Sequence, residues 1–225
     1  MPTVGHDLPE RLELPLRTGE PWWYWLGGRS ALDFANTQRE RWRRRVETLV
    51  TPDDLALWLV RADLLAEPRP VADVLLREAR ELREAIDAGV CAAVAHDPVP
   101  AEAIALIDRW LVHAGTRPRL AIGPGGRPML GRAPIVAGDG SADDPDAARR
   151  ALGAIALDAA RMLGTTEEAA RVRICASETC SARFYDRSPA ARRRWCSMAT
   201  CGNEAKARRH RARRRKTTHS ALEAT

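Results

Sequence analysis

The sequence is poor in the features that mark membrane and secreted proteins. No apolar run within its 225 residues approaches the roughly 18 to 20 residues of a membrane-spanning helix. The N-terminal segment is charged throughout and lacks the apolar core of a signal peptide. We therefore expect a cytoplasmic protein with no membrane partner, whose cysteines are free, metal-bound or catalytic and not paired in disulfides.

The sequence also lacks the motifs that accompany common enzyme sites. No phosphate-binding loop or dinucleotide fingerprint is present, and the Gly-Pro-Gly-Gly stretch at 123–126 indicates a turn. None of the scattered histidines joins a Ser/Asp or cysteine pair in a catalytic pattern; they are His6, His96, His113, His210 and His219. We therefore expect no catalytic residues, and an enzyme with its active site in the N-terminal domain ranks below the functions considered next.

Negative charge is scarce at one end of the chain. Residues 1–170 carry 21 Lys and Arg against 26 Asp and Glu, whereas residues 171–216 carry 15 against 3. Arginine supplies most of the positive charge everywhere, since only Lys206 and Lys216 are lysines. A basic end on a mildly acidic body is the charge layout of a nucleic-acid-binding module attached to another domain.

Hydrophobic periodicity predicts mostly helical structure before residue 170. Apolar residues at helical spacing predict helices over 30–37, 51–65, 71–95, 100–114 and 143–163. Two short apolar pieces around the Gly-Pro-Gly-Gly turn predict a β-hairpin at 117–130. The Trp-rich stretch at 21–30 suggests a short strand. A Ser-Pro start predicts one further short helix at 188–195.

Four of the five cysteines form two matched pairs near the C-terminus, with the spacing Cys175-x4-Cys180-x15-Cys196-x4-Cys201. Each pair forms a turn that directs two sulfurs at one point, which is typical of a tetrahedral four-thiolate site. Neither pair is the Cys-x-x-Cys of a thiol-redox motif. An iron–sulfur cluster also uses four thiolates, but the basic surroundings favour one structural Zn2+ with no open position.

These observations give an expected organisation: mostly α with a small β element (α+β). We expect a flexible N-terminus at 1–20, a helical domain at 21–170, a four-cysteine zinc module with a basic helix at 171–216, and a disordered tail at 217–225. Because so small a module cannot fold by apolar burial alone, zinc must stabilise it. We therefore expect a chelator to unfold this module and leave the helical domain folded.

A basic helix is expected directly after the last cysteine, where Ala and Arg dominate. It has no apolar stripe to bury, so phosphate is the expected partner, and double-stranded DNA the expected ligand. The candidate nucleic-acid-binding residues are Arg192, Arg193, Arg194, Lys206, Arg208, Arg209, Arg211, Arg213, Arg214 and Arg215. Arginine-rich helices also bind RNA, so an RNA-binding protein remains an alternative.

A candidate ligand pocket lies earlier in the chain. Asp33, Asn36 and Thr37 fall on one side of the predicted helix at 30–37, because they lie three and four residues apart. Trp23 and Trp25 just upstream could wall an apolar pocket in which these polar groups orient a small molecule. The alternative is structural, because Asp, Asn and Thr commonly bond to neighbouring backbone.

The stretch "FYDRSPAARRRWCSMATCGNEAKARRHRARRR", with the preceding Cys-x4-Cys, closely resembles the CGNR zinc-finger family of bacteria. "ALDFANT" at 31–37 resembles the start of the ABATE domain, which precedes that finger in the family. The resemblance implies a bacterial transcription regulator of stress responses, with a zinc module that binds DNA and an N-terminal domain that senses a small molecule. It carries the metal-ligand role to the four cysteines and adds Asn203 to the nucleic-acid-binding set.

One position departs from the family motif, because the final Arg of CGNR is Glu204 here. A glutamate removes a cation and suits the first turn of a helix. From the sequence we expect Glu204→Arg to tighten DNA binding, provided that position 204 faces DNA. Our interpretation is thus a regulator whose N-terminal domain senses a small-molecule effector or mediates association, for example as a homodimer.

Overall fold

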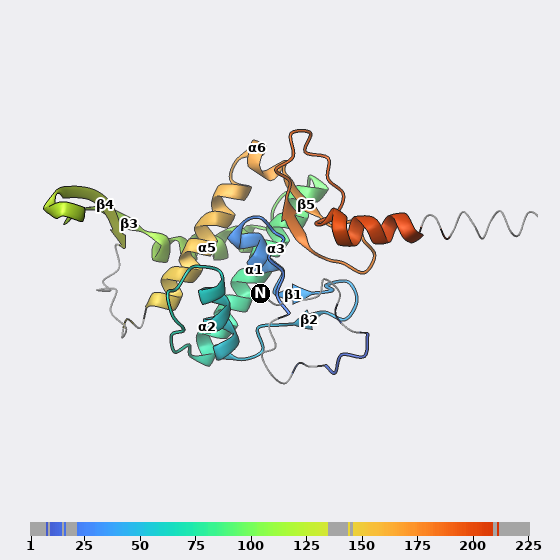
Figure 1. Cartoon of the computed structure of the whole chain (residues 1–225), viewed down its shortest axis with the longest axis horizontal. Helices are drawn as coiled ribbons and strands as arrows, with labels where there is room; N and C mark the ends of the chain where they lie inside the picture. The colour runs from blue at the N-terminus through green and yellow to red at the C-terminus, as the bar shows by residue number, and fades with distance from the viewer. Residues whose placement is uncertain are drawn as a thin grey trace, which may run out of the picture.

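The computed structural model describes residues 8, 10–14, 16, 22–134, 144, 146–208 and 211. Within these ranges the chain is mostly helical and carries three small antiparallel sheets, each of two strands (Figure 1). The expected fold class is confirmed. Most of the predicted flexible N-terminus, 1–20, and all of the predicted tail, 217–225, lie outside the described residues. The predicted nucleic-acid-binding residues Arg209, Arg213, Arg214 and Arg215 also lie outside them.

In the described part of the chain, six α-helices precede the four clustered cysteines. They are α1 (Ser30–Ala35), α2 (Pro52–Arg61), α3 (Asp73–Ala95), α4 (Ala101–Leu111), α5 (Ala147–Leu163) and α6 (Thr166–Ala169). Short 3-10 turns, η1 (Val112–Ala114) and η2 (Pro124–Gly126), follow α4 and form the hairpin tip. The helix starts follow local chemistry: Thr51 and Asp54 form a reciprocal capping box at α2, as its Thr-Pro-Asp-Asp sequence indicates.

The strands pair as neighbours in sequence. β1 (Gln38–Arg39) pairs with β2 (Val46–Glu47), β3 (Thr116–Ile122) with β4 (Pro128–Pro134), and β5 (Val172–Ile174) with β6 (Arg183–Tyr185). The β3–β4 hairpin is the one predicted from the Gly-Pro-Gly-Gly turn, and its tip contains Gly125 and Gly126 at positive φ. In Figure 1 it extends from the body at the end opposite the zinc module.

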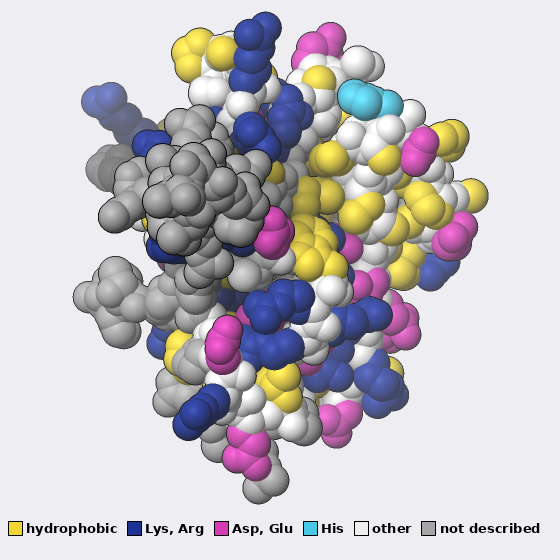
Figure 2. All heavy atoms as spheres, turned by 90° about the vertical axis from the view of Figure 1, so that its right-hand side faces the viewer, with side chains coloured by type: hydrophobic (Ala, Val, Ile, Leu, Met, Phe, Trp, Pro, Cys, Tyr) yellow, Lys and Arg dark blue, Asp and Glu magenta, His cyan; other side chains and the backbone are white. Residues whose placement is uncertain are grey.

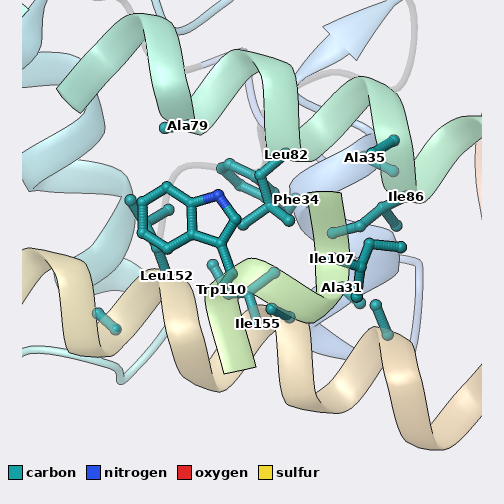
Figure 3. Close-up of a cluster of buried hydrophobic side chains, with 14 of the residues drawn as sticks. Ala31, Phe34, Ala35, Ala79, Leu82, Ile86, Ile107, Trp110, Leu152 and Ile155 are labelled. Carbon is teal, nitrogen blue, oxygen red and sulfur yellow. The ribbon is translucent and has the colours of Figure 1, made fainter. Parts of the chain in front are cut away.

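The core lies where α1, α3, α4 and α5 meet. Figure 3 shows its side chains converging from these helices: Ala31, Phe34, Ala35, Ala79, Leu82, Ile86, Ile107, Trp110, Leu152 and Ile155. Trp58 of α2 joins them with its ring centroid 5.1 Å from that of Phe34. No helix in the described part of the chain combines the length and apolarity that crossing a bilayer requires.

The zinc module is packed on this core. Val172 of β5 is fully buried in the main cluster, and Ile174 and Tyr185 pack against it. β5 lies against α3 and β6 against α1. The expected four-cysteine module is therefore present, but it shares its apolar contacts with the helical domain.

Two local predictions are wrong. Residues 188–195 form a turn instead of a helix, because the Asp186 carboxylate accepts hydrogen bonds from the backbone N–H groups of Ser188 and Arg193. Ala191 has φ +46°, which a right-handed helix does not allow. The Trp-rich stretch 22–26 runs without a strand partner, and of its tryptophans Trp23 is buried in the main core.

Candidate metal centre and nucleic-acid interface

The four cysteines are positioned by the β5–β6 hairpin and by the turn that precedes the basic helix. Cys175 directly follows β5, and its N–H donates to the Ala182 carbonyl at 2.9 Å, which extends the ladder towards the site. The Ala182 N–H points at the Cys180 Sγ, 3.5 Å away. Ala176 N–H donates to the Arg194 carbonyl at 2.8 Å, which brings the second cysteine pair to the first.

The sulfurs converge on one point. All four Sγ atoms lie within 4.8 Å of one another, and all four residues are buried. Cys180 and Cys196 Sγ are 3.8 Å apart, and Cys196 and Cys201 Sγ are 3.9 Å apart. A zinc ion with Zn–S bonds of about 2.3 Å requires tetrahedron edges of about 3.8 Å. The residues thus fit the ion, and they form a single structural zinc site.

Crowding of the thiols explains why a cation is needed. Hydrogen bonds from the neighbouring thiols lower the pKa of Cys175, whereas the bond to Cys175 and burial raise the pKa of Cys180. Contacts with the other thiols and burial also raise the pKa of Cys196. A thiolate at one cysteine therefore disfavours deprotonation of the neighbouring thiols, and a bound dication would compensate the repulsion between the thiolates.

The body contributes a tyrosine–arginine pair beside the sulfurs. Tyr24 belongs to the same buried cluster as the four cysteines. The Arg39 guanidinium lies 3.7 Å from the centroid of the Tyr24 ring and donates to its hydroxyl. Burial raises the pKa of Tyr24 and lowers that of Arg39, and Arg39 also interacts electrostatically with Cys180. Arg39 is therefore a buried cation that can offset thiolate charge.

The residues of the predicted ligand pocket are held by structural contacts. The Asn36 amide donates to the Arg183 carbonyl at 2.9 Å and accepts from the Arg183 N–H at 2.8 Å, so it continues the edge of β6. The Thr37 hydroxyl donates to the Phe34 carbonyl. The Asp33 carboxylate accepts from the Gly27 N–H at 2.7 Å. Whether these groups also orient a ligand stays a prediction.

The two tryptophans of that pocket differ in burial. Trp23 is buried, and its indole N–H donates to the Thr48 carbonyl. Trp25 stacks on Trp58 with ring centroids 5.6 Å apart and leaves 41% of its surface exposed. The rings of Trp23 and Trp25 meet edge to face. Each of the five predicted pocket residues thus makes contacts within the protein, and none of them lines the cavities described below.

One ion pair joins the body to the zinc module, and a second arginine, paired within the body, lies over an aromatic ring of the module. Arg183 of β6 pairs with Asp87 of α3 and contacts the half-buried Cys91, with its Nη2 3.8 Å from Sγ. On the other side Arg29 bonds to both Asp158 and Glu168, and its guanidinium lies 5.3 Å from the Tyr185 ring. Sequence analysis missed these pairs, since their partners are 96 to 139 residues apart. No local pattern indicates such pairing.

The predicted nucleic-acid-binding residues divide into two groups. Arg192, Arg194, Asn203, Lys206 and Arg211 are exposed. Arg193 is exposed as well, but its guanidinium donates to the Cys196 carbonyl at 2.7 Å and lies over the Phe184 ring. Arg208 forms an ion pair with Glu178 at 2.8 Å. A hollow of about 280 Å3 lies among Arg192, Arg194, Trp195 and Met198.

The basic helix begins at the metal site itself. A π-type turn, η3 (Met198–Gly202), contains Cys201 and leads into a helix over 203–208. A side chain at Gly202 would place Cβ 2.8 Å from the sulfur of the exposed Met198 side chain, which would have to move aside. The next residue but one, Glu204, lines a cavity of about 220 Å3 together with Arg39, Arg43, Arg44 and Thr179.

Two family models match the sequence. One, named ABATE and described as that of a proposed stress-induced transcription regulator, matches residues 28–166. The other, the CGNR zinc finger, matches residues 171–214. No curated protein sequence matches the chain. The resemblance that the motifs indicated is confirmed, and both matched families are of regulator and zinc-finger type and not of enzymes.

Proposed function

Because the chain belongs to the ABATE family of proposed stress-induced transcription regulators and carries a CGNR zinc finger, we propose that it is a zinc-dependent DNA-binding transcription regulator of the cytoplasm. The proposal rests on one observation: the basic helix begins directly at a zinc ligand. Cys201 is both a zinc ligand and part of the turn that starts the basic helix. Zinc would therefore fix the direction in which that helix presents its cations.

The charge on this face suits phosphate. Arg192, Arg194 and Lys206 are exposed, and the chain after residue 208 adds further arginines. Each phosphate neutralised by such a cation releases counterions and makes binding sensitive to salt. If about six cations contact duplex DNA, log affinity falls with log salt at a slope near −5.

The helical body would regulate this activity. In our proposal it senses a small-molecule effector or mediates association of two copies, and Asp33, Asn36, Thr37, Trp23 and Trp25 remain the proposed effector-binding residues. The junction between the body and the zinc module supports such regulation, because Asn36 contacts both backbone groups of Arg183 in β6. A ligand that moved Asn36 would therefore move a strand of the zinc module.

Selection from random duplex DNA with zinc-loaded protein tests the proposal. Enrichment of a motif would support sequence-specific binding, and a palindromic motif would support a homodimer. The double variant Arg192→Ala/Arg194→Ala should lose most retention, whereas Arg77→Ala/Arg109→Ala on the exposed faces of α3 and α4 should not. A salt slope near zero would exclude phosphate binding, and displacement of DNA by structured RNA would favour the RNA-binding alternative.

A further inference from the structure

The loop between β1 and β2 presents an aromatic ring and two arginines to solvent. Trp42 is 48% exposed, and the Arg43 side chain is 42% exposed. Arg45 is also exposed, and its side chain makes no hydrogen bond or ion pair with the part of the chain that the structure describes. Arg43 forms a long ion pair with Glu40, with a nitrogen–oxygen distance of 3.9 Å. Two cations of the body are therefore available to an external partner.

The other arginines of this loop hold it in place. Arg41 pairs with Glu84 at 2.6 Å and with Asp87 at 3.2 Å, both on α3. Arg44 pairs with Glu40 at 2.5 Å. Arg41 and Arg44 thus hold the loop in place, whereas Arg43 and Arg45 are exposed. A run of charges that served only solubility would not require such a division.

The loop is also closed by its backbone. The N–H groups of Arg43 and Arg45 both donate to the Glu40 carbonyl, at 2.8 and 3.0 Å. Glu40 and Arg45 have φ of +47° and +52°, in the left-handed region that residues with a side chain adopt at a cost. Such conformations persist where the surroundings impose them, and they cluster at functional sites. Arg43 and Arg45 are therefore presented from a fixed turn.

The loop adjoins the basic helix of the zinc module. The Trp42 indole N–H donates to the Glu178 carbonyl at 3.2 Å, and the Glu178 carboxylate pairs with Arg208 at 2.8 Å. The backbone N–H of Arg41 donates to the Ser181 hydroxyl at 3.0 Å. Figure 2, which looks onto this end of the molecule, shows several Lys and Arg side chains on its surface, with Asp and Glu side chains among them.

We propose that the β1–β2 loop is a second nucleic-acid contact, in which Arg43 and Arg45 bind phosphates beside the stretch bound by the zinc module and Trp42 packs its exposed ring against the backbone sugar. The inference rests on the proposed function, since it extends the same interface onto the body. Arginine side chains are among the groups that most often contact phosphate oxygens of duplex DNA. Phosphate contacts of this kind fix position and register without reading sequence.

The double variant Arg43→Ala/Arg45→Ala tests the loop in the zinc-loaded full chain. Loss of two phosphate contacts should make the slope of log affinity against log salt shallower by about 1.8 units on duplex DNA. The loss should be the same for every DNA sequence tested, because these contacts read no bases. Arg43→Lys/Arg45→Lys should restore most of the slope, since lysine also binds phosphate as a point charge.

The matched control is Arg77→Ala/Arg109→Ala, which removes the same net charge from α3 and α4, away from this end. Equal slopes for the loop variant and this control would overturn the inference while leaving the proposed function intact. Absence of duplex binding by the unmodified protein would instead remove the proposed function. Zinc content and unfolding temperature, unchanged in both variants, show that the fold is retained.

Tryptophan fluorescence tests the contact of Trp42 with DNA separately. Trp42→Phe keeps an aromatic ring but loses the indole fluorescence at this position, so the fluorescence change on adding DNA should be smaller than in the unmodified protein. An identical change in the variant would show that Trp42 does not contact DNA. Arg43 and Arg45 would then be tested by the salt slope alone, and a slope equal to that of the control would leave no loop contact at all.

Discussion

At the scale of single residues, Asp33 shows how burial alters a titrating group. Its carboxylate accepts a hydrogen bond from the Gly27 N–H, and burial raises its pKa to about 7. Asp158 nearby raises it further. A carboxyl with a higher pKa in the folded state binds its proton more tightly there, so its contribution to stability is full below about pH 4 and is lost as pH rises through about 7.

Asp33→Asn should remove this dependence, because the amide oxygen keeps the acceptor for Gly27 without titrating. Between pH 6 and pH 8 the unmodified protein should lose about 1.4 kcal/mol of unfolding free energy that the variant retains. Urea denaturation at both pH values, with saturating zinc, measures the difference. Asp108→Asn, at an exposed position on α4, is the control and should leave the pH dependence unchanged. Parallel curves for Asp33→Asn and the unmodified protein would contradict the assignment.

Glu204 is the second residue whose surroundings change an expectation. The sequence alone predicts that Glu204→Arg tightens DNA binding. In the structure Glu204 is half-buried and lines a cavity with Arg39, Arg43 and Arg44. An arginine there would face like charges, so we now expect it to destabilise the protein by about 1 kcal/mol, less at high salt.

Thermal unfolding of Glu204→Arg and Glu204→Gln at low and high salt measures this effect. The glutamine variant removes a charge without reversing it and should fall between the other two proteins. A stable Glu204→Arg variant with higher DNA affinity would show that position 204 faces DNA, as the sequence-based expectation had it.

At the scale of elements, the contact between α1 and β6 depends on one side chain. Both backbone groups of Arg183 are satisfied by the Asn36 amide. Asn36→Ala would leave a buried N–H and a buried carbonyl without partners, at about 1 to 3 kcal/mol each. We expect a total loss of about 2 to 6 kcal/mol in chemical denaturation. Asn203→Ala, at an exposed position, is the control, and a similar small effect of both would show that Asn36 does not hold the junction.

The same contact shows which features the sequence could predict. Helices α2 to α5 were predictable because capping residues and apolar periodicity are local, as in the Thr51–Asp54 box. The zinc ligands were predictable because paired spacing is itself the signal. Asn36 carried only a local signal, a polar residue on a short helix, which suggested a ligand pocket. Its partner Arg183 is 147 residues away and acts through its backbone, which no side-chain pattern reveals.

At the scale of the whole molecule, contacts between the body and the zinc module link the two parts into one structural unit. Val172 is part of the main core, Tyr24 of the body lies among the four cysteines, and Arg183 pairs with Asp87 of α3. The sequence predicts that a chelator unfolds the module alone. Because these contacts tie the two parts together, we expect metal removal to destabilise α1 and the Trp-rich segment as well.

Unfolding of the full chain with and without a chelator distinguishes the two expectations. Structural zinc in a four-thiolate site contributes about 10 to 16 kcal/mol of apparent binding energy, which is comparable to the whole net stability of a domain, about 5 to 15 kcal/mol. If the parts are coupled, the zinc-loaded protein unfolds in one transition, and chelation lowers the unfolding temperature of the helical signal. Because Asn36→Ala weakens the contact between α1 and β6, chelation should lower the unfolding temperature of the helical signal less in this variant than in the unmodified protein. A helical transition that chelation leaves unchanged in the unmodified protein would show that the body folds independently of the metal.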